Sequence, residues 1–286
     1  MAEEGTISSR TGLVGILGHP VGHSLSPLMH NAAFRAQDID MVYLAFDVLP
    51  EHLPSAIAGI RSLGLRGVNV TIPHKEAVVE LLDEVEESAR RIGAVNTVVN
   101  DQGRLTGYNT DKSGFLAALL GLRAEGATGL DCFVAGAGGA ARGVVAALVE
   151  GGAAKVRVWN RSPERAAALC SQAAEWGQTP CSAIPRDEVP GAVASADLVV
   201  NATSIGLMSR IKDSAIPVDN LTSNHVVFDL VYGPTLTTLV REAKARGATA
   251  IDGKEMLVMQ AAGSYELWTG RRAPADVMRD SIDGDR

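Results

Sequence analysis

The chain has 286 residues, which is more than one typical domain and fits two domains of moderate size. Hydrophobic residues make up 46% of it, and its formal net charge of −7, with no cluster of Lys and Arg, argues against nucleic-acid binding. No apolar run is long enough to span a bilayer, and the first residues lack the apolar core of a signal peptide, so we expect a cytoplasmic protein that does not bind membranes.

The three cysteines show neither a metal-binding pattern nor a disulfide framework. Cys132, Cys170 and Cys181 are odd in number and have no C-x-x-C spacing. Cys132 lies in an apolar run and Cys170 in a predicted helix, so we interpret both as plain apolar residues. We expect no bound metal.

Short apolar strands alternate with helices at the start of the chain. Ser26 followed by Pro27 is a typical helix start. The hydroxyls of Ser24 and Ser26 could point into a cleft at the positive end of this helix, or they could simply cap it. The predicted elements are strands over residues 13–17, 42–48 and 65–72 and helices over 26–36 and 51–63.

The strand predicted over 65–72 ends in a dense group of polar residues. Asn69 and Thr71 share one face of the strand, because alternate side chains point the same way. Lys75 begins the next predicted helix, where its charge opposes the helix dipole, and such a departure from local preference is typical of functional sites. A solvated lysine at the edge of a loop is the alternative.

A second group of polar residues follows. Asn96 lies on a predicted strand, and Asp111 immediately precedes a predicted helix. Asp111 could contribute a carboxylate to a site or could serve only as a helix cap. The predicted elements are a helix over 76–92 that Asp83 could interrupt, strands over 94–99 and 104–108 joined by a hairpin turn at 100–103, and a helix over 112–122.

A glycine-rich turn organises the second half of the chain. Gly136, Gly138 and Gly139 follow a buried strand predicted over 132–135, and a helix is predicted over 140–149. A G-x-G-x-x-A pattern in this context is typical of a dinucleotide-binding turn, in which the helix N-terminus faces the phosphates. A glycine turn without a ligand is the alternative, but a second strand over 155–159 completes a βαβ unit and favours the dinucleotide.

The residues after this second strand favour NADP over NAD. An NAD site usually places Asp or Glu there to bind the ribose 2′-hydroxyl. This chain instead has Asn160, with Arg161 and Arg165 close behind, and guanidinium groups suit a 2′-phosphate. The alternative is that both arginines are ordinary surface residues at the start of a helix, for which Ser162 is the expected N-cap.

Strands and helices continue to alternate, which predicts an α/β fold with a parallel sheet. Residues 201–206 close one strand at the carboxyl edge, where ligands bind in such sheets. Gln260 lies in a helical tail among small and apolar residues, where it could be satisfied in the core or could face a ligand. The remaining predicted elements are strands over 197–201, 225–230 and 248–251 and a helix over 163–176.

Taken together, eight segments of the chain resemble the shikimate dehydrogenase family, in the family's order and over nearly the whole sequence. They are residues 18–31, 69–75, 93–97, 109–111, 136–142, 160–162, 229–232 and 256–261. The resemblance implies a reversible, NADPH-dependent reduction of 3-dehydroshikimate to shikimate, a step toward aromatic amino acids. It also implies an α/β fold with two domains, in which residues 1–110 and 252–286 bind the substrate and 111–251 form a Rossmann-type NADP domain.

The resemblance assigns roles to individual residues. Lys75 falls on the family's catalytic lysine, and we expect it to act as a general acid and base supported by Asp111. His74 stands where many members carry Phe, and residues 207–217 follow no pattern that we can assign. The implied substrate contacts are Ser24, Ser26, Asn69, Thr71, Asn96, Asp111, Tyr232 and Gln260, and the implied cofactor contacts are Gly136, Ala137, Gly138, Gly139, Ala140, Asn160, Arg161, Ser162, Arg165, Thr203, Leu230 and Gly253.

Three other functions compete with this one. A quinate/shikimate dehydrogenase with broader specificity would share these motifs. A regulatory module that binds NADP without turnover would not need Lys75 and Asp111. Glutamyl-tRNA reductase shares a similar glycine turn, but it needs a nucleophilic Cys, and no Cys lies in the site segments. We expect a small-molecule substrate and a monomer or homodimer.

Overall fold

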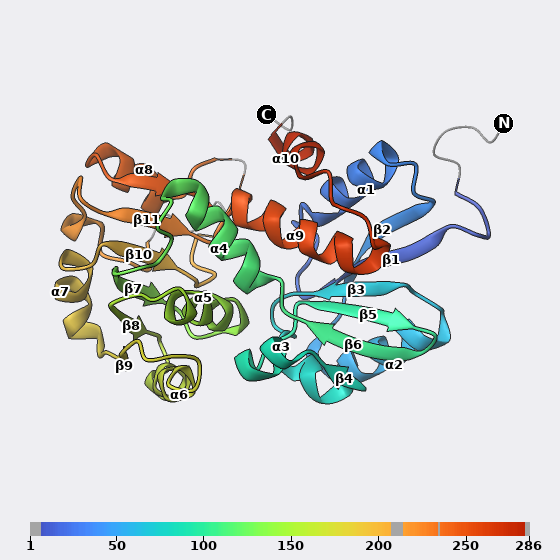
Figure 1. Ribbon diagram of the computed structural model, residues 1–286, viewed down its shortest axis with the longest axis horizontal. Coiled ribbons are helices and arrows are strands. Elements are labelled where there is room, and N and C mark those ends of the chain that lie inside the picture. The colour runs from blue at the N-terminus through green and yellow to red at the C-terminus, as the bar shows by residue number, and fades with distance from the viewer. Residues whose placement is uncertain (1–6, 207–213, 234, 284–286) are drawn as a thin grey trace. The chain divides into compact units, whose positions relative to one another are not determined.

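The structure is a computed structural model that describes residues 7–206, 214–233 and 235–283. The chain divides into two compact units, of which one comprises Met1–Gly114 with Leu257–Arg286 and the other Phe115–Met256 (Figure 1). The chain passes from one unit to the other within helix α4 (Asp111–Leu122) and again within helix α9 (Lys254–Thr269).

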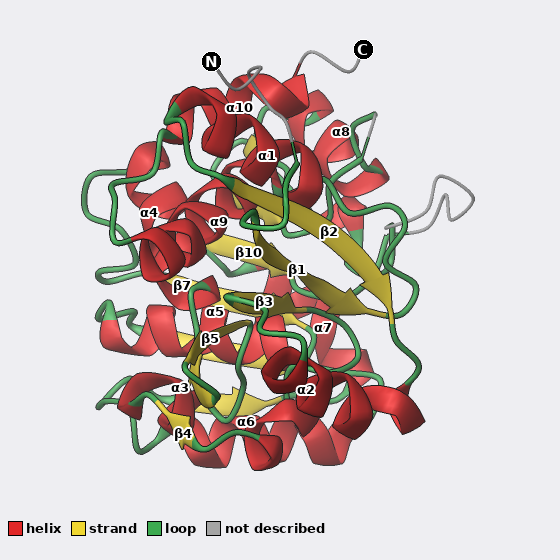
Figure 2. Cartoon of the chain, turned by 90° about the vertical axis from the view of Figure 1, so that its right-hand side faces the viewer, coloured by secondary structure: helices red, strands yellow, loops and turns green. Residues whose placement is uncertain are grey.

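The first unit is built on a mixed six-stranded sheet with the order β2-β1-β3-β5-β6-β4 (Figure 2). β1 runs parallel to β2 and β3, whereas β5 is antiparallel to both β3 and β6. A tight turn joins β5 to β6 through Gln102 and Gly103, both at positive φ, as the predicted hairpin requires. The strands are β1 (Gly12–Gly18), β2 (Met41–Asp47), β3 (Gly67–Val70), β4 (Glu84–Val85), β5 (Thr97–Asp101) and β6 (Arg104–Tyr108).

Helices cover both faces of this sheet. Val14 and Ile16 of β1 pack with α1, α9 and α10, while Leu17 of the same strand packs with α2 on the other side. This split follows from the two-residue period of a strand, which turns successive side chains to opposite faces. The helices are α1 (Ser26–Ala36), η1 (Pro50–His52), α2 (Leu53–Ser62), η2 (Ala77–Leu81), α3 (Glu87–Ile92) and α10 (Ala275–Asp283).

The helix predicted over residues 76–92 is wrong for most of its length. A 3₁₀ helix, η2, is followed by the short strand β4 and then by α3. Asp83 interrupts the segment because its carboxylate accepts hydrogen bonds from the Leu105 backbone N–H and from Arg61. Glu86 then caps α3 by accepting a hydrogen bond from the Ala89 N–H. Tertiary pairing with β6 therefore overrides the local helical preference.

The second unit holds a parallel sheet of six strands with the order β12-β11-β10-β7-β8-β9. Chain order reverses between β7 and β10, which is the Rossmann arrangement and confirms the predicted fold class. Sequence patterns missed β9, which has only three residues. The strands are β7 (Asp131–Ala135), β8 (Lys155–Trp159), β9 (Cys181–Ala183), β10 (Leu198–Asn201), β11 (Val226–Asp229) and β12 (Thr249–Ile251), and the helices are α5 (Gly139–Glu150), α6 (Pro163–Ala173), η3 (Arg186–Glu188), α7 (Val189–Ala194), η4 (Val218–Asn220) and α8 (Thr238–Ala245).

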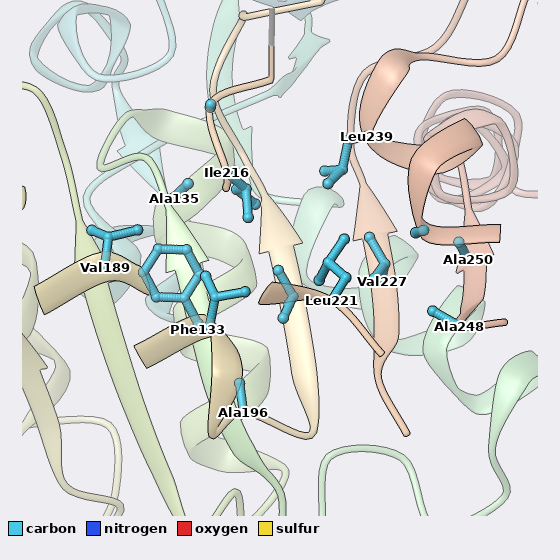
Figure 3. Packing of buried hydrophobic residues seen from close by; sticks show 14 of the residues in the cluster. Phe133, Ala135, Val189, Ala196, Ile216, Leu221, Val227, Leu239, Ala248 and Ala250 are labelled. Atoms are coloured by element: carbon cyan, nitrogen blue, oxygen red, sulfur yellow. The ribbon is translucent and has the colours of Figure 1, made fainter. Parts of the chain in front are cut away.

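A core of aliphatic side chains and Phe133 lies on one face of this parallel sheet (Figure 3). Phe133 and Ala135 of β7 point into it, together with Val227 of β11 and Leu239 of α8. Because aromatic residues are scarce in the chain, small and branched side chains fill most of the space. None of the described helices has both the length and the apolar character needed to cross a membrane.

One buried histidine links the first unit's stability to pH. His30 stacks on Tyr43 with ring centroids 4.4 Å apart and planes 1° from parallel, and neither of its ring nitrogens has a hydrogen-bond partner among the described residues. Burial lowers the pKa of His30 from 6.5 to about 3. The folded protein therefore holds this imidazole neutral.

We predict that acid destabilises the protein through His30. The unfolded chain takes up the proton below pH 6.5 and the folded chain only near pH 3, so stability present at neutral pH is lost as the pH falls through this window. The free energy of unfolding should drop by about 2 kcal/mol from pH 7 to pH 5 on account of this residue. In urea unfolding, the free energy of unfolding of His30→Phe should depend less steeply on pH than that of the unmodified chain. The control His52→Gln, which changes an exposed histidine, should show the same pH dependence as the unmodified chain. An unchanged slope in His30→Phe would refute the assignment.

Candidate active site

Lys75 and Asp111 form a buried ion pair within the first unit. Lys75 Nζ lies 2.5 Å from Asp111 Oδ2, and the side chains are only 12% and 5% exposed. Lys75 lies in the turn between β3 and η2, not at the start of an α-helix as predicted, whereas Asp111 is the first residue of α4. The alternative of a solvated lysine at a loop edge is therefore excluded.

Asn96 fixes the orientation of the Asp111 carboxylate. Asn96 Nδ2 donates to Asp111 Oδ1 at 3.1 Å and to Thr110 Oγ1 at 2.9 Å, and Asn96 Oδ1 accepts from the Thr110 N–H at 2.7 Å. Both oxygens of Asp111 are thus engaged, one with a cation and the other with an amide. Asn109 Oδ1 accepts from the Lys112 N–H at the start of α4, so the capping role considered for Asp111 belongs to Asn109.

Behind Asn96, a layer of buried hydrogen bonds crosses the first unit. Asn69 Nδ2 donates to Ser264 Oγ at 2.9 Å and to Thr97 Oγ1 at 3.1 Å, and Asn69 Oδ1 accepts from the Tyr43 hydroxyl at 2.7 Å. Sequence reasoning selected Asn69 but missed Tyr43, Thr97 and Ser264, because their roles come from strands and helices far apart in the chain. Asn31 could have pointed to Tyr43, since it lies in residues 18–31, the first segment that resembles the family. Its side-chain amide bonds both the N–H and the C=O of Tyr43.

The hydroxyl residues of the first segment lie where β1 and β3 end and α1 begins. Ser26 is buried and is the first residue of α1, whose N-cap is Leu25 without a side-chain hydrogen bond, so Ser26 does not cap the helix, which was one of its two possible roles. Ser24 Oγ accepts from the Ser26 N–H at 3.2 Å. Thr71 approaches Gly18 so closely that a Cβ on Gly18 would lie 2.3 Å from Thr71 Cγ2, which explains the glycine at this position.

His74 and Gln260 are both held by protein groups. His74 is buried and its Nε2 lies 2.7 Å from the Val48 carbonyl oxygen, so its ring is tied to the main chain beyond β2. Gln260 Nε2 donates to the Leu257 carbonyl at 2.8 Å, and its Oε1 accepts from Asn96 at 3.3 Å. A Cβ on Gly114 would lie 2.8 Å from the Gln260 backbone nitrogen, so α4 and α9 meet closely at this point.

In the second unit, the glycine turn has the features that phosphate binding requires. Gly136 has φ +119°, and a Cβ there would lie 2.7 Å from the Ala202 carbonyl oxygen. Any other residue would therefore be both strained and obstructed. Gly138 is the N-cap of α5, and nothing lies within 4 Å of the place where its Cβ would stand. A ligand can approach the backbone there, ahead of Gly139 and Ala140 in the first turn of α5.

The segment after β8 presents two arginines. Arg161 and Arg165 are exposed side chains that flank the start of α6. Asn160 Nδ2 donates to the Ser162 carbonyl at 3.0 Å and shapes the turn. Ser162 occupies the N-cap position as predicted, but its hydroxyl donates to Glu164 Oε2 rather than capping the helix. A hydrogen bond from the Glu164 backbone N–H and then this bond from Ser162 lower the pKa of Glu164.

The loop after β10 lies against the glycine turn. Thr203 Oγ1 donates to Asn201 Oδ1 at 2.7 Å, and Asn201 Nδ2 donates to Asp229 Oδ1 at 2.8 Å. Burial raises the pKa of Asp229 to about 6. The carboxyl ends of β10 and β11 are thereby tied together beside Gly136, as expected for the ligand-binding edge of this sheet.

The other expected contacts at this edge follow β11. A Cβ on Gly253 would lie 2.1 Å from the Leu230 carbonyl oxygen, so these two predicted cofactor residues touch through their backbones. Tyr232 is half-buried, and burial raises the pKa of its hydroxyl to about 12. Of the unassigned segment 207–217, residues 207–213 lie outside the described residues. Among the described residues, no group of three or more His, Cys, Asp or Glu side chains could hold a metal ion.

Comparison with known proteins identifies the family. Family models match the chain over residues 16–98 (shikimate dehydrogenase substrate binding domain), 122–252 (shikimate / quinate 5-dehydrogenase) and 253–282 (shikimate 5′-dehydrogenase C-terminal domain). The shikimate dehydrogenase (NADP⁺) of Moorella thermoacetica is 48% identical over 275 residues, which are 95% of this chain and 92% of that protein.

Solved structures agree with this assignment. The shikimate 5-dehydrogenase of Thermus thermophilus, in complex with NADP(H) and shikimate, is 40% identical, with a TM-score of 0.83 over 96% of this chain and 99% of that one. The quinate dehydrogenase of Corynebacterium glutamicum, in complex with NAD, is 37% identical, with a TM-score of 0.87 over 96% and 99%. The predicted family is confirmed: this chain belongs to the shikimate dehydrogenase family.

Proposed function

We propose that the chain is an NADP-dependent shikimate dehydrogenase that reversibly reduces 3-dehydroshikimate to shikimate in aromatic amino-acid biosynthesis. The observation that carries this proposal is the buried contact of 2.5 Å between Lys75 Nζ and Asp111 Oδ2. It occurs in a chain whose curated relatives, matched over nearly its whole length, are named shikimate dehydrogenase (NADP⁺).

In the proposed mechanism, Lys75 handles the proton. NADPH, when bound, supplies a hydride to the carbonyl carbon of the substrate. The Lys75 ammonium donates its proton to the carbonyl oxygen as negative charge develops there, and the neutral amine takes a proton back in the reverse direction. Asp111 and Asn96 hold the ammonium in place, so that it need not reorganise during the reaction.

The first unit supplies groups that suit a polyhydroxylated ring bearing a carboxylate. We assign residues 1–110 and 252–286 to substrate binding, with the hydroxyls of Ser24, Ser26 and Thr71 as donors. Asn96 and Gln260 present amides beside Asp111. The Asn69 amide already bonds Tyr43, Ser264 and Thr97, so we propose that it supports the site from behind while the other groups touch the substrate.

The second unit supplies groups that suit NADP. We assign residues 111–251 to cofactor binding, with the pyrophosphate at the glycine turn and the 2′-phosphate at Arg161 and Arg165. The fit is supported by the open approach to Gly138 and by the exposure of both guanidinium groups. Thr203, Leu230 and Gly253, the other proposed cofactor contacts, lie at the ligand-binding edge of the same sheet, and Tyr232, which follows β11, stays a proposed substrate contact. A monomeric or homodimeric state and a cytoplasmic location stay predictions.

A second candidate is a dehydrogenase of broader specificity that also accepts quinate. It is favoured by the likeness to a quinate dehydrogenase solved with NAD. Steady-state assays of the purified chain with shikimate and quinate, each with NADP and NAD, should give the highest kcat/KM for shikimate with NADP. Equal or higher values with quinate would establish the second candidate. A protein that binds NADPH but turns over neither substrate would instead be a regulatory module.

Replacement of the proposed general acid should abolish turnover without abolishing binding. Lys75→Met keeps the aliphatic length but removes the proton, so kcat should fall about 10²–10⁴-fold. The KM for shikimate should change only a few-fold. Lys112→Met is the matched control, since Lys112 follows Asp111 directly but donates to Ser88, and its kcat should stay close to that of the unmodified chain. A near-normal kcat in Lys75→Met would remove Lys75 from the chemistry.

Reversal of charge at the proposed 2′-phosphate site should change cofactor preference. Arg161→Asp should raise the KM for NADP about 10- to 100-fold, because a hydrogen bond to a charged group contributes about 1.5–3 kcal/mol. The KM for NAD, which lacks this phosphate, should change far less. Lys244→Asp places the same charge change on the exposed face of α8 in the same unit and should alter neither value. Equal losses for NADP and NAD in Arg161→Asp would contradict the assignment.

A further inference from the structure

Two cysteines that sequence analysis treated as unrelated meet at the edge of the parallel sheet. Cys170 Sγ on α6 lies 3.1 Å from Cys181 Sγ at the first residue of β9, and the Cys181 thiol donates to Cys170. Both thiols are free. Eleven positions separate them in the chain, and α6 packs directly against β9. The two sulfur atoms are therefore already in contact in the folded chain.

The contact distinguishes this pair from the third cysteine. Cys132 is fully buried in β7, and its Sγ faces the Leu130 carbonyl oxygen. Burial raises the pKa of the Cys132 thiol to about 12, so it is a poor nucleophile. Cys181 is only half-buried, and the hydrogen bond that it donates lowers the pKa of the Cys170 thiol. Cys170 is itself buried, so a small oxidant reaches the pair beside the half-buried Cys181, and the lower pKa favours Cys170 as the thiol that reacts first.

We propose that Cys170 and Cys181 are a site of reversible disulfide formation that fastens α6 to β9. With a hydroperoxide as oxidant, the Cys170 thiolate attacks the peroxide oxygen, giving a sulfenic acid and releasing hydroxide or alkoxide. The Cys181 thiol then attacks the Cys170 sulfur, forming the S–S bond and releasing water. Two thiols are oxidised and one hydroperoxide is reduced. A dithiol reductant reverses the step by exchange.

The link would act on one edge of the sheet of the second unit. β9 has three residues and lies at the end of the sheet, and among the described strands it pairs only with β8. Short edge strands open readily because few hydrogen bonds hold them. A disulfide between α6 and β9 would close the segment 170–181 and restrict its unfolded conformations, which stabilises the folded form.

Mass spectrometry of the full chain tests the proposal. The reduced chain, treated with an equivalent of hydrogen peroxide, should lose the mass of two hydrogen atoms and yield one peptide that joins Cys170 to Cys181. Cys132 should remain a thiol, and dithiothreitol should restore the original mass. The oxidised chain should melt about 5 °C higher than the reduced one. Cys181→Ser should show no gain in melting temperature and should instead accumulate a sulfenic acid at Cys170 that dimedone traps.

Three results would overturn the proposal. The first is a wild-type chain in which Cys170 proceeds to sulfinic acid without linkage. The second is a disulfide that joins two chains, visible as a dimer on a non-reducing gel. The third is a linked chain whose melting temperature equals that of the reduced form, which would show that the bond does not fasten the edge of the sheet. None of these measurements depends on the proposed enzymatic activity, so this proposal and the proposed function fail separately.

Discussion

The buried ion pair of Lys75 with Asp111 constrains the first unit. Removing two charges from water costs several kcal/mol per ion, and their attraction offsets this only when the remaining polar atoms are also satisfied. Asn96 meets that need for the carboxylate, because it bonds the oxygen that Lys75 leaves open. The turn after β3, the residue before β5 and the start of α4 must all lie correctly for these bonds to form. The same constraint gives the unit an ammonium whose position is set before any substrate arrives.

A polar layer behind the ion pair connects it by hydrogen bonds to strands and helices across the first unit. From Asn96 the hydrogen bonds pass through Thr97 and Ser264 to Asn69 and then to the Tyr43 hydroxyl. Buried networks of this kind specify one arrangement strongly, since a broken member leaves several groups unpaired. The layer ends against apolar packing, where His30 stacks on Tyr43 and stays neutral. The geometry of the Lys75–Asp111 pair and the packing of the core are thus held by connected side chains.

The second unit depends instead on close contacts between backbone segments, which glycine residues make possible. Gly136 and Gly253 are each placed so that a Cβ would collide with a carbonyl oxygen, of Ala202 and Leu230 respectively. Small residues let the carboxyl ends of the strands gather around the start of α5, where free N–H groups and the helix dipole favour anions. The charged side chains Arg161 and Arg165 lie apart from this turn in sequence, after β8. In the proposed site, phosphate recognition and the choice between NAD and NADP therefore rest on separate segments.

Sequence alone determined the features that depend on local pattern. These are the glycine turn, most strands and helices and the parallel α/β arrangement, because turn chemistry and the two-residue and helical periods are written along the chain. The choice of Lys75, Asp111 and Asn96 came from the family resemblance, since local pattern left their roles open. The sequence also suggested an interruption at Asp83, but only the tertiary structure decided that a 3₁₀ helix and the strand β4 replace most of the helix predicted over 76–92. It also decided that β9 exists and that Tyr43 and Ser264 complete the polar layer. Cys170 and Cys181 likewise looked like unrelated residues until α6 and β9 brought them together. Each of these features arises from contacts between distant segments, whose free energy outweighs local preference and leaves no periodic trace in the sequence.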